Sequence, residues 1–508
     1  MNLIEANVKI FGEFTDLNDV KELKDFSNIG SMLKHCFEQY KDSVAIVDKS
    51  VSYTYKNIET NTGYIRFKLN QLGIKPGDNV GVLFSNSVEF VEASLALMSY
   101  GCVAVVLPYH LDEKTIYGCS LKFNLKGIIT NPNEEKVKFA VQTNQNLKLM
   151  EYVSSIEEKT EYEPIIESKP TDSAVILFTG GTTGKSKGAV LSHKAVMSGT
   201  INGCFGSGKL MRNKYFLVLP LSHVFGFIRN MMTSIYTCSS LYICRDTKNM
   251  FREIPAFNPT IMIMVPALAE MALGVSKMAG NVIFGNALKT IICGAAVVNP
   301  HLAKEYNKLG ITLLAGYGLT ESANLVSGNP KTLENPTSVG LPYGNQELKI
   351  VDGELWIKGD NVLTEYYNSP EENALAFEDG YFKTGDLIKQ DENGYLYIVG
   401  RIKDVIVLSS GENIYPEELE TKFCKLDCIQ DCLIYTNATS DILILEALPR
   451  PSIIKEMGIT DVESYCIGKI QEVNKTLPTH ERISKIVIRN TDFERTPSMK
   501  IKRIKTKC

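Results

Sequence analysis

The amino-acid sequence predicts an α/β protein of 508 residues with a large N-terminal part and a small C-terminal α+β domain. Up to about residue 295, short apolar runs alternate with helix-like segments, which is typical of parallel sheets with helical crossovers. From about Ser338 the pattern changes to alternating strands with tight turns, which indicates antiparallel hairpins. A proline-led acidic helix start at residues 415–418 then opens a further unit. We place the domain boundary at residues 400–403, which gives an N-terminal domain (1–400) and a C-terminal domain (401–508).

The parallel part begins with a strand, a helix, a strand, a helix and a strand in succession. These elements are expected at residues 43–47, 55–73, 79–85, 87–101 and 103–108. Further strands are expected at residues 126–130, 173–179, 215–220, 260–266 and 289–294. They are mostly apolar, so we expect both faces of these strands to be buried, as parallel sheets require.

The antiparallel part contains two hairpins with characteristic turn residues. The first is "ELKIVDGELWIKGD" (347–360), with the turn pair Asp352-Gly353 between its strands. The second is "DLIKQDENGYLYIVG" (386–400), with the pair Asn393-Gly394. Asp-Gly and Asn-Gly are favoured in hairpin turns because they accept the positive φ angles that such turns need.

Composition and charge exclude several classes of protein. With 54 basic and 58 acidic residues the net charge is −4, so the chain lacks the basic surface of a nucleic-acid-binding protein. The N-terminus has no basic start followed by an apolar core, and no stretch of about 18 uninterrupted apolar residues occurs. We therefore expect a soluble, cytoplasmic protein without a transmembrane segment.

The twelve cysteines are mostly scattered within apolar runs, so we expect them to be reduced core residues. Cys424, Cys428 and Cys432 repeat every four residues and could lie along one helical face. No histidine or further cysteine stands at zinc-finger spacing beside them, so we predict no metal site there.

The segment "FTGGTTGKSKG" (178–188) is rich in glycine, threonine and lysine. Glycines let the backbone approach an anion closely, N–H groups and hydroxyls point toward it, and lysines neutralise it. The pattern is not a P-loop, because the first glycine of that motif would have to occupy position 179, which is Thr179. The segment is either a phosphate-binding loop or a flexible surface turn with solvated lysines.

Further motifs follow in a fixed order along the chain. They are "LPLSHVFGF" (219–227), "CGAA" (293–296), "AGYGLTES" (315–322), "YFKTGD" (381–386), "GRIKDVIVLSSGENIYPEELE" (400–420) and "RTPSMKIKR" (495–503). Together with the glycine-rich segment, and with "YTYKNIE" (53–59) near the start, this series resembles the adenylate-forming superfamily of acyl-CoA synthetases, adenylation domains and firefly-type luciferases. The chain is most similar to the fatty acyl-CoA synthetases of that superfamily.

The resemblance implies a fold and a reaction. The N-terminal domain should include a small β-barrel-like subdomain, and the C-terminal domain should be mobile. A carboxylate would attack the α-phosphate of ATP, with Mg²⁺ bound, and pyrophosphate would leave. A thiol would then capture the acyl-adenylate as a thioester. Such a reaction needs charge neutralisation and positioning more than covalent chemistry from the protein.

The resemblance also assigns nucleotide-binding roles. The phosphates would be wrapped by Thr179, Gly180, Gly181, Thr182, Thr183, Gly184 and Lys187. Thr320 and Glu321 would meet the α-phosphate and the magnesium ion, which prefers oxygen ligands. The adenine would lie between Tyr317, flanked by Gly316 and Gly318, and the turn Gly294, Ala295, Ala296. Asp386 would accept both ribose hydroxyls, with Arg401 nearby. On the residues alone, Tyr317 is equally well a packed core tyrosine.

Three residues are implied to act through the mobile domain. Lys500 would reach into the site and bridge the acyl carboxylate and the α-phosphate, although alone it resembles a solvated lysine in a basic tail. Lys403 would sit at the hinge, where the alternative is an exposed linker charge. Gly411 would present the coenzyme A tunnel in the second of two domain arrangements.

The acid is indicated only broadly. Amino-acid-activating relatives carry a Phe-Asp pair where this chain has His223 and the two residues after it, so no counter-ion for an ammonium group is evident. The following segment, "GFIRNMMTSIY" (226–236), forms either an adaptable apolar pocket or an ordinary buried helix. His223 either gates the acyl site or is structural. Ala315 replaces the Glu or Gln of many relatives, which favours a fatty or aryl acid.

Coenzyme A is the expected acceptor, because the chain ends at Cys508 without a carrier domain, and an external acyl carrier protein is the main alternative. Two other functions stay open: a catalytically silent acyl- or nucleotide-binding relative, and a kinase-like NTPase that would release ADP. The chain departs from the family pattern at Gly180, Ser186 and Met499, where relatives usually have serine, proline and glycine.

Overall fold

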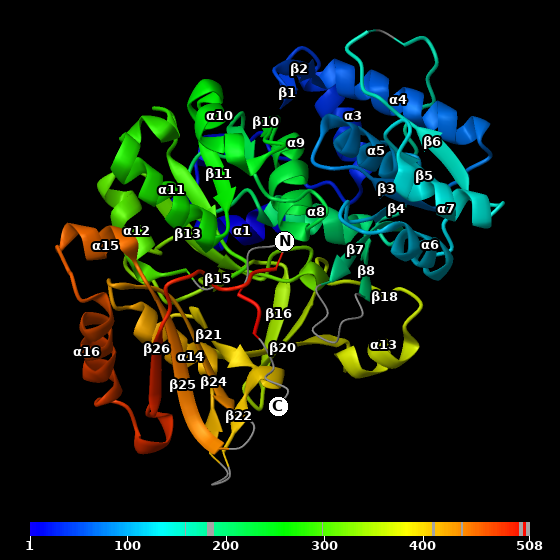
Figure 1. Ribbon diagram of the computed structural model, residues 1–508. Coiled ribbons are helices and arrows are strands. Elements are labelled where there is room, and N and C mark those ends of the chain that lie inside the picture. Colours follow the sequence, from blue (N-terminus) through cyan, green and yellow to red (C-terminus); the bar gives the residue numbers. More distant parts are fainter. Residues whose placement is uncertain are drawn as a thin grey trace.

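The computed structural model describes residues 1–157, 159–179, 187–296, 298–408, 412–437, 440–496 and 501–503. Within them the chain forms two large mixed sheets, a five-stranded antiparallel sheet and a smaller C-terminal unit (Figure 1). The three N-terminal helices α1 (Leu3–Phe11), α2 (Leu17–Val20) and α3 (Ile29–Tyr40) precede the first strand. No helix in this described part is both long and apolar enough to cross a membrane.

The first sheet has seven strands in the order β18-β8-β7-β4-β3-β5-β6. Its parallel strands are β3 (Asn79–Leu83), β4 (Val103–Val106), β5 (Gly127–Thr130), β6 (Lys148–Glu151) and β7 (Ser173–Thr179). Two antiparallel strands, β8 (Lys187–Ser192) and β18 (Glu365–Tyr366), extend one edge. The helices of this part are α4 (Tyr55–Gln71), α5 (Val88–Ser99), α6 (Glu113–Lys122) and α7 (Glu135–Thr143). The predicted parallel pairing of β3 with β4 is confirmed.

The second sheet has nine strands in the order β15-β14-β13-β12-β11-β9-β10-β1-β2. The strands are β1 (Val44–Asp48), β2 (Val51–Thr54), β9 (Lys214–Leu217), β10 (Ser240–Ile243), β11 (Ile261–Met264), β12 (Thr290–Cys293), β13 (Thr312–Tyr317), β14 (Ser327–Asn329) and β15 (Leu341–Pro342). The helices of this part are α8 (His193–Asn202), α9 (Thr233–Tyr236), α10 (Met250–Phe257), α11 (Pro266–Ala279) and α12 (Pro300–Lys308). Strands such as β11 and β12 are buried along their whole length, as predicted.

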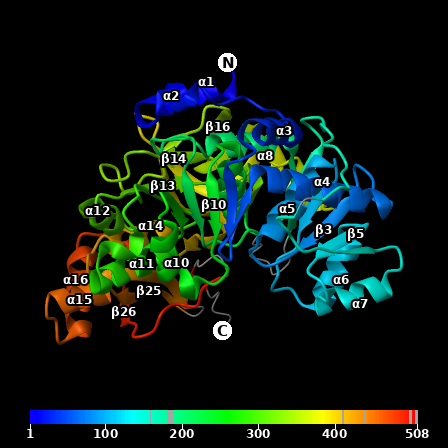
Figure 2. The same ribbon diagram turned by 90° about the horizontal axis from the view of Figure 1, so that it is seen from above.

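One expected pairing is wrong. The alternation of elements predicts that β1 joins β3 in one parallel sheet, but β1 pairs in parallel with β10 of the second sheet. β1 first turns back into β2 through Lys49 and Ser50, whose φ angles are 48° and 69°, and α4 then carries the chain to the other sheet. α5 contacts β3 and β4 of the first sheet and β1 of the second, so it lies between the two sheets (Figure 2).

The antiparallel sheet confirms the predicted hairpins. β16 (Gln346–Val351) pairs with β17 (Glu354–Gly359) across Asp352-Gly353, whose φ angles of 51° and 84° are those of a primed hairpin turn. β20 (Tyr381–Gln390) pairs with β17, with the short β19 (Phe377–Glu378), and with β21 (Leu396–Arg401) across the turn that contains Gly394. The helix α13 (Pro370–Ala376) precedes β19.

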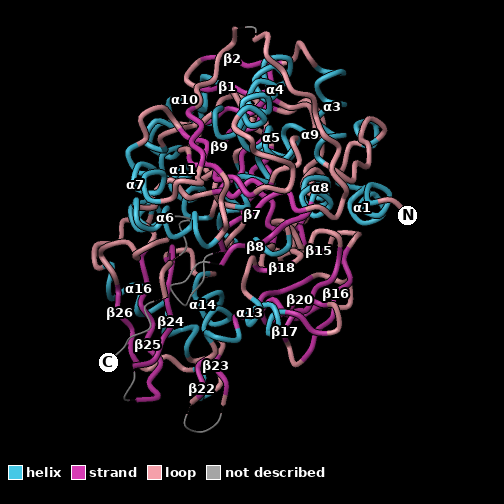
Figure 3. Tube along the Cα trace, turned by 90° about the vertical axis from the view of Figure 1, so that its right-hand side faces the viewer, coloured by secondary structure: helices cyan, strands magenta, loops and turns pink. Residues whose placement is uncertain are grey.

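The C-terminal unit has its own apolar core, separate from the N-terminal one. It contains β22 (Ile406–Val407), β23 (Asn413–Ile414), α14 (Pro416–Cys424), β24 (Ile429–Asn437), β25 (Ser440–Pro449), α15 (Pro451–Glu456), α16 (Val462–Asn474) and β26 (Lys485–Ile488). In Figure 3 these elements lie below the first sheet. The helix α14 begins at the predicted proline, Pro416.

The three cysteines spaced by four do not share a helical face. Cys424 ends α14, Cys428 lies in the following turn and Cys432 is on β24. The expectation is wrong because the chain leaves the helix after Cys424. The sulfurs of Cys424 and Cys432 are 3.5 Å apart, and the described residues hold no cluster of ligands suited to a metal ion.

Candidate active site

A continuous cavity of about 1780 Å³ opens between the N-terminal sheets and the C-terminal unit. Every predicted site residue within the described ranges lines this cavity: Thr179, Lys187, His223, Gly294, Ala295, Ala296, Gly316, Tyr317, Gly318, Thr320, Glu321, Asp386, Arg401 and Lys403. The other predicted residues, Gly180, Gly181, Thr182, Thr183, Gly184, Gly411 and Lys500, lie outside the described residues. The structure therefore brings together motifs that are more than 200 residues apart, such as Thr179 and Arg401.

Asp386 is the centre of the first polar cluster in the cavity. It lies on β20 and is 2% exposed. Its Oδ2 accepts a hydrogen bond from the Tyr317 hydroxyl at 2.6 Å, and its Oδ1 pairs with Arg401 Nε at 2.8 Å. A carboxylate oxygen has two lone pairs, so both oxygens keep acceptor capacity for a further donor. The cluster is built to hold a group with hydroxyl donors.

Glu321 is the centre of the second cluster. It belongs to the single 3-10 turn Thr320–Ser322, and its Oε1 accepts a hydrogen bond from the Tyr366 hydroxyl at 2.8 Å. Burial raises the pKa of Glu321, while the Tyr366 hydrogen bond acts in the opposite direction. The Lys187 ammonium lies 4.8 Å from the centroid of the Tyr366 ring. A carboxylate and a cation thus flank one tyrosine at the cavity wall.

The turn between these clusters requires glycine at position 318. A Cβ atom there would lie 1.6 Å from the carbonyl oxygen of Asn324, so no other residue fits without moving the backbone. Ala323 and Asn324 adopt positive φ angles of 46° and 81° and fold the chain back against this glycine. The turn fixes Thr320 and Glu321 relative to Tyr317.

The loop after β12 forms another wall of the cavity. Gly294 packs against the ring of Phe225, whose Cζ would be 3.4 Å from a Cβ at this position. Ala295 has a positive φ of 68°, which a residue other than glycine seldom adopts. The strain is typical of a backbone that is held for function.

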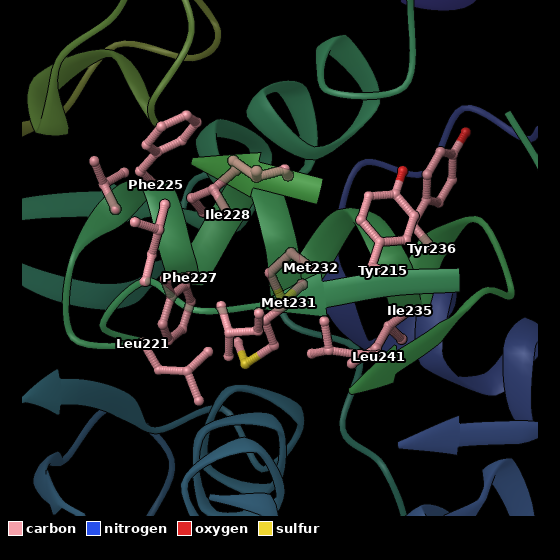
Figure 4. Close-up of a cluster of buried hydrophobic side chains, with 14 of the residues drawn as sticks. Tyr215, Leu221, Phe225, Phe227, Ile228, Met231, Met232, Ile235, Tyr236 and Leu241 are labelled. Atoms are coloured by element: carbon pink, nitrogen blue, oxygen red, sulfur yellow. The ribbon is translucent and has the colours of Figure 1, made fainter. Parts of the chain in front are cut away.

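The segment after His223 is divided between the cavity and the core. His223, Phe225 and Arg229 line the cavity. Met231 and Met232 instead belong to the buried apolar cluster, together with Phe227 (Figure 4). Both methionines are fully buried, which favours the buried-helix alternative for them, although the segment Phe225–Met232 is a π-helix. The Nδ1 atom of His223 accepts a hydrogen bond from the backbone N–H of Phe225 at 3.2 Å.

The C-terminal unit closes the cavity from the other side. Arg503 pairs with Glu420 at 2.5 Å and lies 3.7 Å from Glu417, and all three line the cavity. Thr496 and Ile501, which flank the position of Lys500 in the sequence, also line it. In the described arrangement the near-terminal segment therefore faces the same space as the N-terminal motifs.

Polar contacts join the two parts of the chain beside the cavity. Arg450, which is 1% exposed, pairs through Nε with Glu270 Oε1 of α11 at 2.9 Å. The Asn299 side chain donates a hydrogen bond to the carbonyl of Cys424 at 2.8 Å. His301 Nδ1 lies 3.4 Å from Asp427. Burial, together with the charge of Arg450, lowers the pKa of His301 to about 4, so this imidazole is neutral at pH 7.

Sequence reasoning missed several residues of the cavity wall, among them Tyr366, Glu417, Glu420 and Arg503. Tyr366 stands in the two-residue strand β18, which no motif marks. Arg229 lies in the apolar segment 226–236. It is the only charged residue of this segment, and that isolation is the sequence feature that could have identified it.

The fold and the cavity define a two-part α/β protein in which carboxylate, tyrosine, arginine and lysine side chains line one cavity between the parts. Comparison with known proteins gives the family. The model of the AMP-binding enzyme family matches residues 33–367, and that of the AMP-binding enzyme C-terminal domain matches residues 403–507. The chain belongs to the AMP-binding enzyme family.

Individual relatives share less than a third of their residues with this chain. A long-chain-fatty-acid–CoA ligase of Yersinia pestis is 27% identical over 78% of this chain and 80% of its own. A 2-succinylbenzoate–CoA ligase of Oceanobacillus iheyensis is 28% identical over 77% of this chain and 82% of its own. The o-succinylbenzoate coenzyme A synthetase of Bacillus subtilis, solved with ATP and a magnesium ion, has a TM-score of 0.75 at 20% identity and covers 92% of this chain and 98% of its own. This structural similarity shows that the chain has the same fold as that synthetase.

Proposed function

We propose that the protein is an ATP-dependent, AMP-forming ligase that joins a fatty or aryl carboxylic acid to coenzyme A through an acyl-adenylate. The observation that carries this proposal is the convergence of the Asp386 cluster and the Glu321 cluster on one cavity. Family membership and the two CoA ligases among the relatives support the reaction class. One of these relatives is named for a fatty acid and the other for an aromatic acid, so the comparison does not decide which of the two substrate classes this protein uses.

Different described residues would bind the ribose, the phosphates and the base of the nucleotide. Asp386 would accept the ribose hydroxyls while Arg401 and Tyr317 hold its carboxylate in place. Lys187 would neutralise phosphate charge, and the Gly294–Ala296 loop would lie against the base. Lys500, by its place in the sequence, would stabilise the negative charge that develops between the two anions. Positioning and charge neutralisation are the main sources of rate in phosphoryl and nucleotidyl transfer.

The donor set fits a magnesium ion. Mg²⁺ in nucleotide sites is usually held by one or two carboxylates together with substrate phosphates and waters, and Glu321 supplies one buried carboxylate at the cavity wall. Tyr366 holds that carboxylate in orientation and favours its charged form. When bound, the ion would neutralise phosphate charge.

Product analysis tests the proposal. The purified protein is incubated with ATP, Mg²⁺, coenzyme A and a panel of carboxylic acids, and the nucleotide products are separated. We expect acid-dependent release of AMP and pyrophosphate together with an acyl-CoA thioester. Release of ADP would contradict the proposal in favour of a kinase-like NTPase. Nucleotide binding without any turnover would identify a catalytically silent relative, and thioester formation only on an added acyl carrier protein would change the acceptor.

A further inference from the structure

One charged group in the cavity wall has no role in the proposed reaction. Arg229 lies in the π-helical segment Phe225–Met232, is only 3% exposed, and lines the cavity. Its Nη1 atom is buried without a hydrogen-bond partner. Among the described residues, no carboxylate lies within ion-pair distance of the guanidinium. Arginine is almost never fully buried unless it is paired, because an uncompensated buried charge costs free energy.

The groups around Arg229 do not balance its charge. Burial raises the pKa of Tyr343 and that of Cys204 to about 12 each, and the positive charge of Arg229 acts in the opposite direction on both. Burial also raises the pKa of Tyr215, again opposed by Arg229. All three groups are neutral at pH 7. Arg229 is therefore a fixed cation surrounded by neutral groups and open to the cavity on one side.

Arg229 lies on the same helical segment as Phe225, which packs against the loop after β12. Phe225 lies beside Gly294, and Arg229 follows four residues later on the same helical segment. The side chain has room because α8 is followed by Gly203, where a Cβ would come within 3.3 Å of Arg229 Cδ.

The space in front of Arg229 is mainly apolar. Phe11 and Tyr343, whose ring centroids are 5.0 Å apart, line the same cavity, as does Phe205. The segment that carries Arg229 is otherwise anchored in the apolar cluster that also contains Tyr215 (Figure 4). Apolar side chains next to the Arg229 guanidinium in this described part of the cavity wall suit an apolar body that ends in an anionic group.

We propose that the acid activated by this protein carries a second carboxylate, which binds to Arg229 at the far end of a short aliphatic or aromatic body. This inference rests on the proposed function and narrows its substrate class. The planar guanidinium fork binds a carboxylate through two parallel hydrogen bonds, which gives orientation as well as affinity. A long unsubstituted fatty acid would place methylene groups against an unpaired charge, so it should be a poor substrate.

Matched acids test the inference directly. Terephthalate and aliphatic dicarboxylates of about four to ten carbons are each compared with the acid in which a methyl group replaces the second carboxylate. The measured quantity is kcat/KM for acid-dependent AMP release with ATP, Mg²⁺ and coenzyme A. Charge-assisted hydrogen bonds are among the stronger ones, so we expect the best dicarboxylate to be favoured by roughly 10- to 100-fold.

Three variants assign that preference to one residue. Arg229→Leu should abolish or reverse the preference for the dicarboxylate. Arg229→Lys keeps the positive charge but loses the two parallel donors of the guanidinium, so it should retain part of this preference. Arg252→Leu is the control, because the Arg252 side chain on α10 is 78% exposed. The control should leave the ratio unchanged.

Thermal unfolding separates the inference from the proposed function. Removing an unpaired buried charge should leave the melting temperature of Arg229→Leu equal to or above that of the natural protein. The best dicarboxylate alone should raise the melting temperature of the natural protein more than that of the variant. If no acid supports AMP release, the proposed function fails while this binding test still decides on Arg229. If acids are activated but the mono- and dicarboxylates are used equally and Arg229→Leu changes nothing, the inference is overturned and the proposed function stands.

Discussion

At the scale of single residues, the site is organised around two carboxylates with different partners. Asp386 is held by a cation and a phenol, whereas the Glu321 carboxylate accepts its side-chain hydrogen bond from the phenol of Tyr366. The ion pair with Arg401 holds the Asp386 carboxylate in place. Glu321 is buried, which raises its pKa, and the Tyr366 hydrogen bond is the largest of the interactions that oppose this rise. This residue should therefore set the acid limit of activity.

Tyr366→Phe tests this dependence. Burial raises the pKa of Glu321 and the Tyr366 hydroxyl opposes that rise, so removing the hydroxyl raises this pKa further. The working form is the carboxylate, and activity is lost as the pH falls through the pKa of that group. We expect the acid limb of kcat/KM for ATP to move to higher pH, with a loss of roughly tenfold at pH 6. Tyr367→Phe is the neighbouring control, and an unchanged profile in Tyr366→Phe would contradict the role of this hydroxyl.

At the scale of elements, tight backbone turns place the site residues. The turn after β13 depends on Gly318, and the loop after β12 holds Ala295 at a positive φ. These segments leave the carboxyl ends of parallel strands, where ligands usually bind in α/β sheets. Loop geometry therefore determines whether Tyr317, Thr320 and Glu321 face the same space.

Gly318→Ala should disrupt this turn. The added Cβ would meet the Asn324 carbonyl at 1.6 Å, so we expect a loss of about 1–3 kcal/mol in the free energy of unfolding and loss of AMP release. Gly274→Ala in α11 is the control, because a Cβ there meets nothing within 4 Å and alanine stabilises a helix by about 0.5–1 kcal/mol. Denaturant unfolding and turnover are measured for both. Full activity in Gly318→Ala would show that the turn does not position the site.

Much at this scale could be predicted from local patterns. The hairpin turn at Asp352-Gly353 follows from the φ angles that its residues accept, and the start of α14 follows from Pro416. The sheet that β1 joins could not be predicted, because alternation fixes the type of pairing but not the partner strand. Tyr366 and Arg229 could not be assigned either, because their roles depend on neighbours that are distant in the sequence.

At the scale of the whole molecule, contacts between the two parts of the chain hold the arrangement that closes the cavity. The Arg450–Glu270 pair is the most buried of them. Thr496 and Ile501 line the cavity in this arrangement, so under the proposed function we expect it to be the one that forms the adenylate. Lys403 lies in the exposed turn Ile402–Asp404 between the two parts, where the predicted hinge would be.

Glu270→Gln should weaken this arrangement. It leaves the Arg450 charge uncompensated, and breaking one side of a buried pair typically costs about 3–5 kcal/mol. We expect adenylate formation to fall several-fold, with a smaller effect on thioester formation from a supplied acyl-adenylate. Glu334→Gln, at an exposed position, is the control. Equal loss in both half-reactions would contradict a role for the pair in one arrangement only.

Lys500→Ala should separate the half-reactions more sharply. Removal of a charge aimed at developing negative charge typically costs about 3–4 kcal/mol, or roughly 100- to 1000-fold in rate. Adenylate formation should fall by this factor, whereas thioester formation from a supplied acyl-adenylate should be nearly unchanged. Both half-reactions are measured on the same preparation, and a parallel loss would assign Lys500 to stability instead of catalysis.

Under the proposed function, distant segments of this chain meet to form a mixed anhydride between an organic acid and AMP. Exchange of labelled pyrophosphate into ATP, measured with Mg²⁺ and a broad panel of mono- and dicarboxylic acids in the absence of coenzyme A, tests this claim most directly. We expect exchange that depends on the acid and that is lost in Lys500→Ala. Absence of exchange with every acid, in protein that is folded and binds ATP, would contradict it.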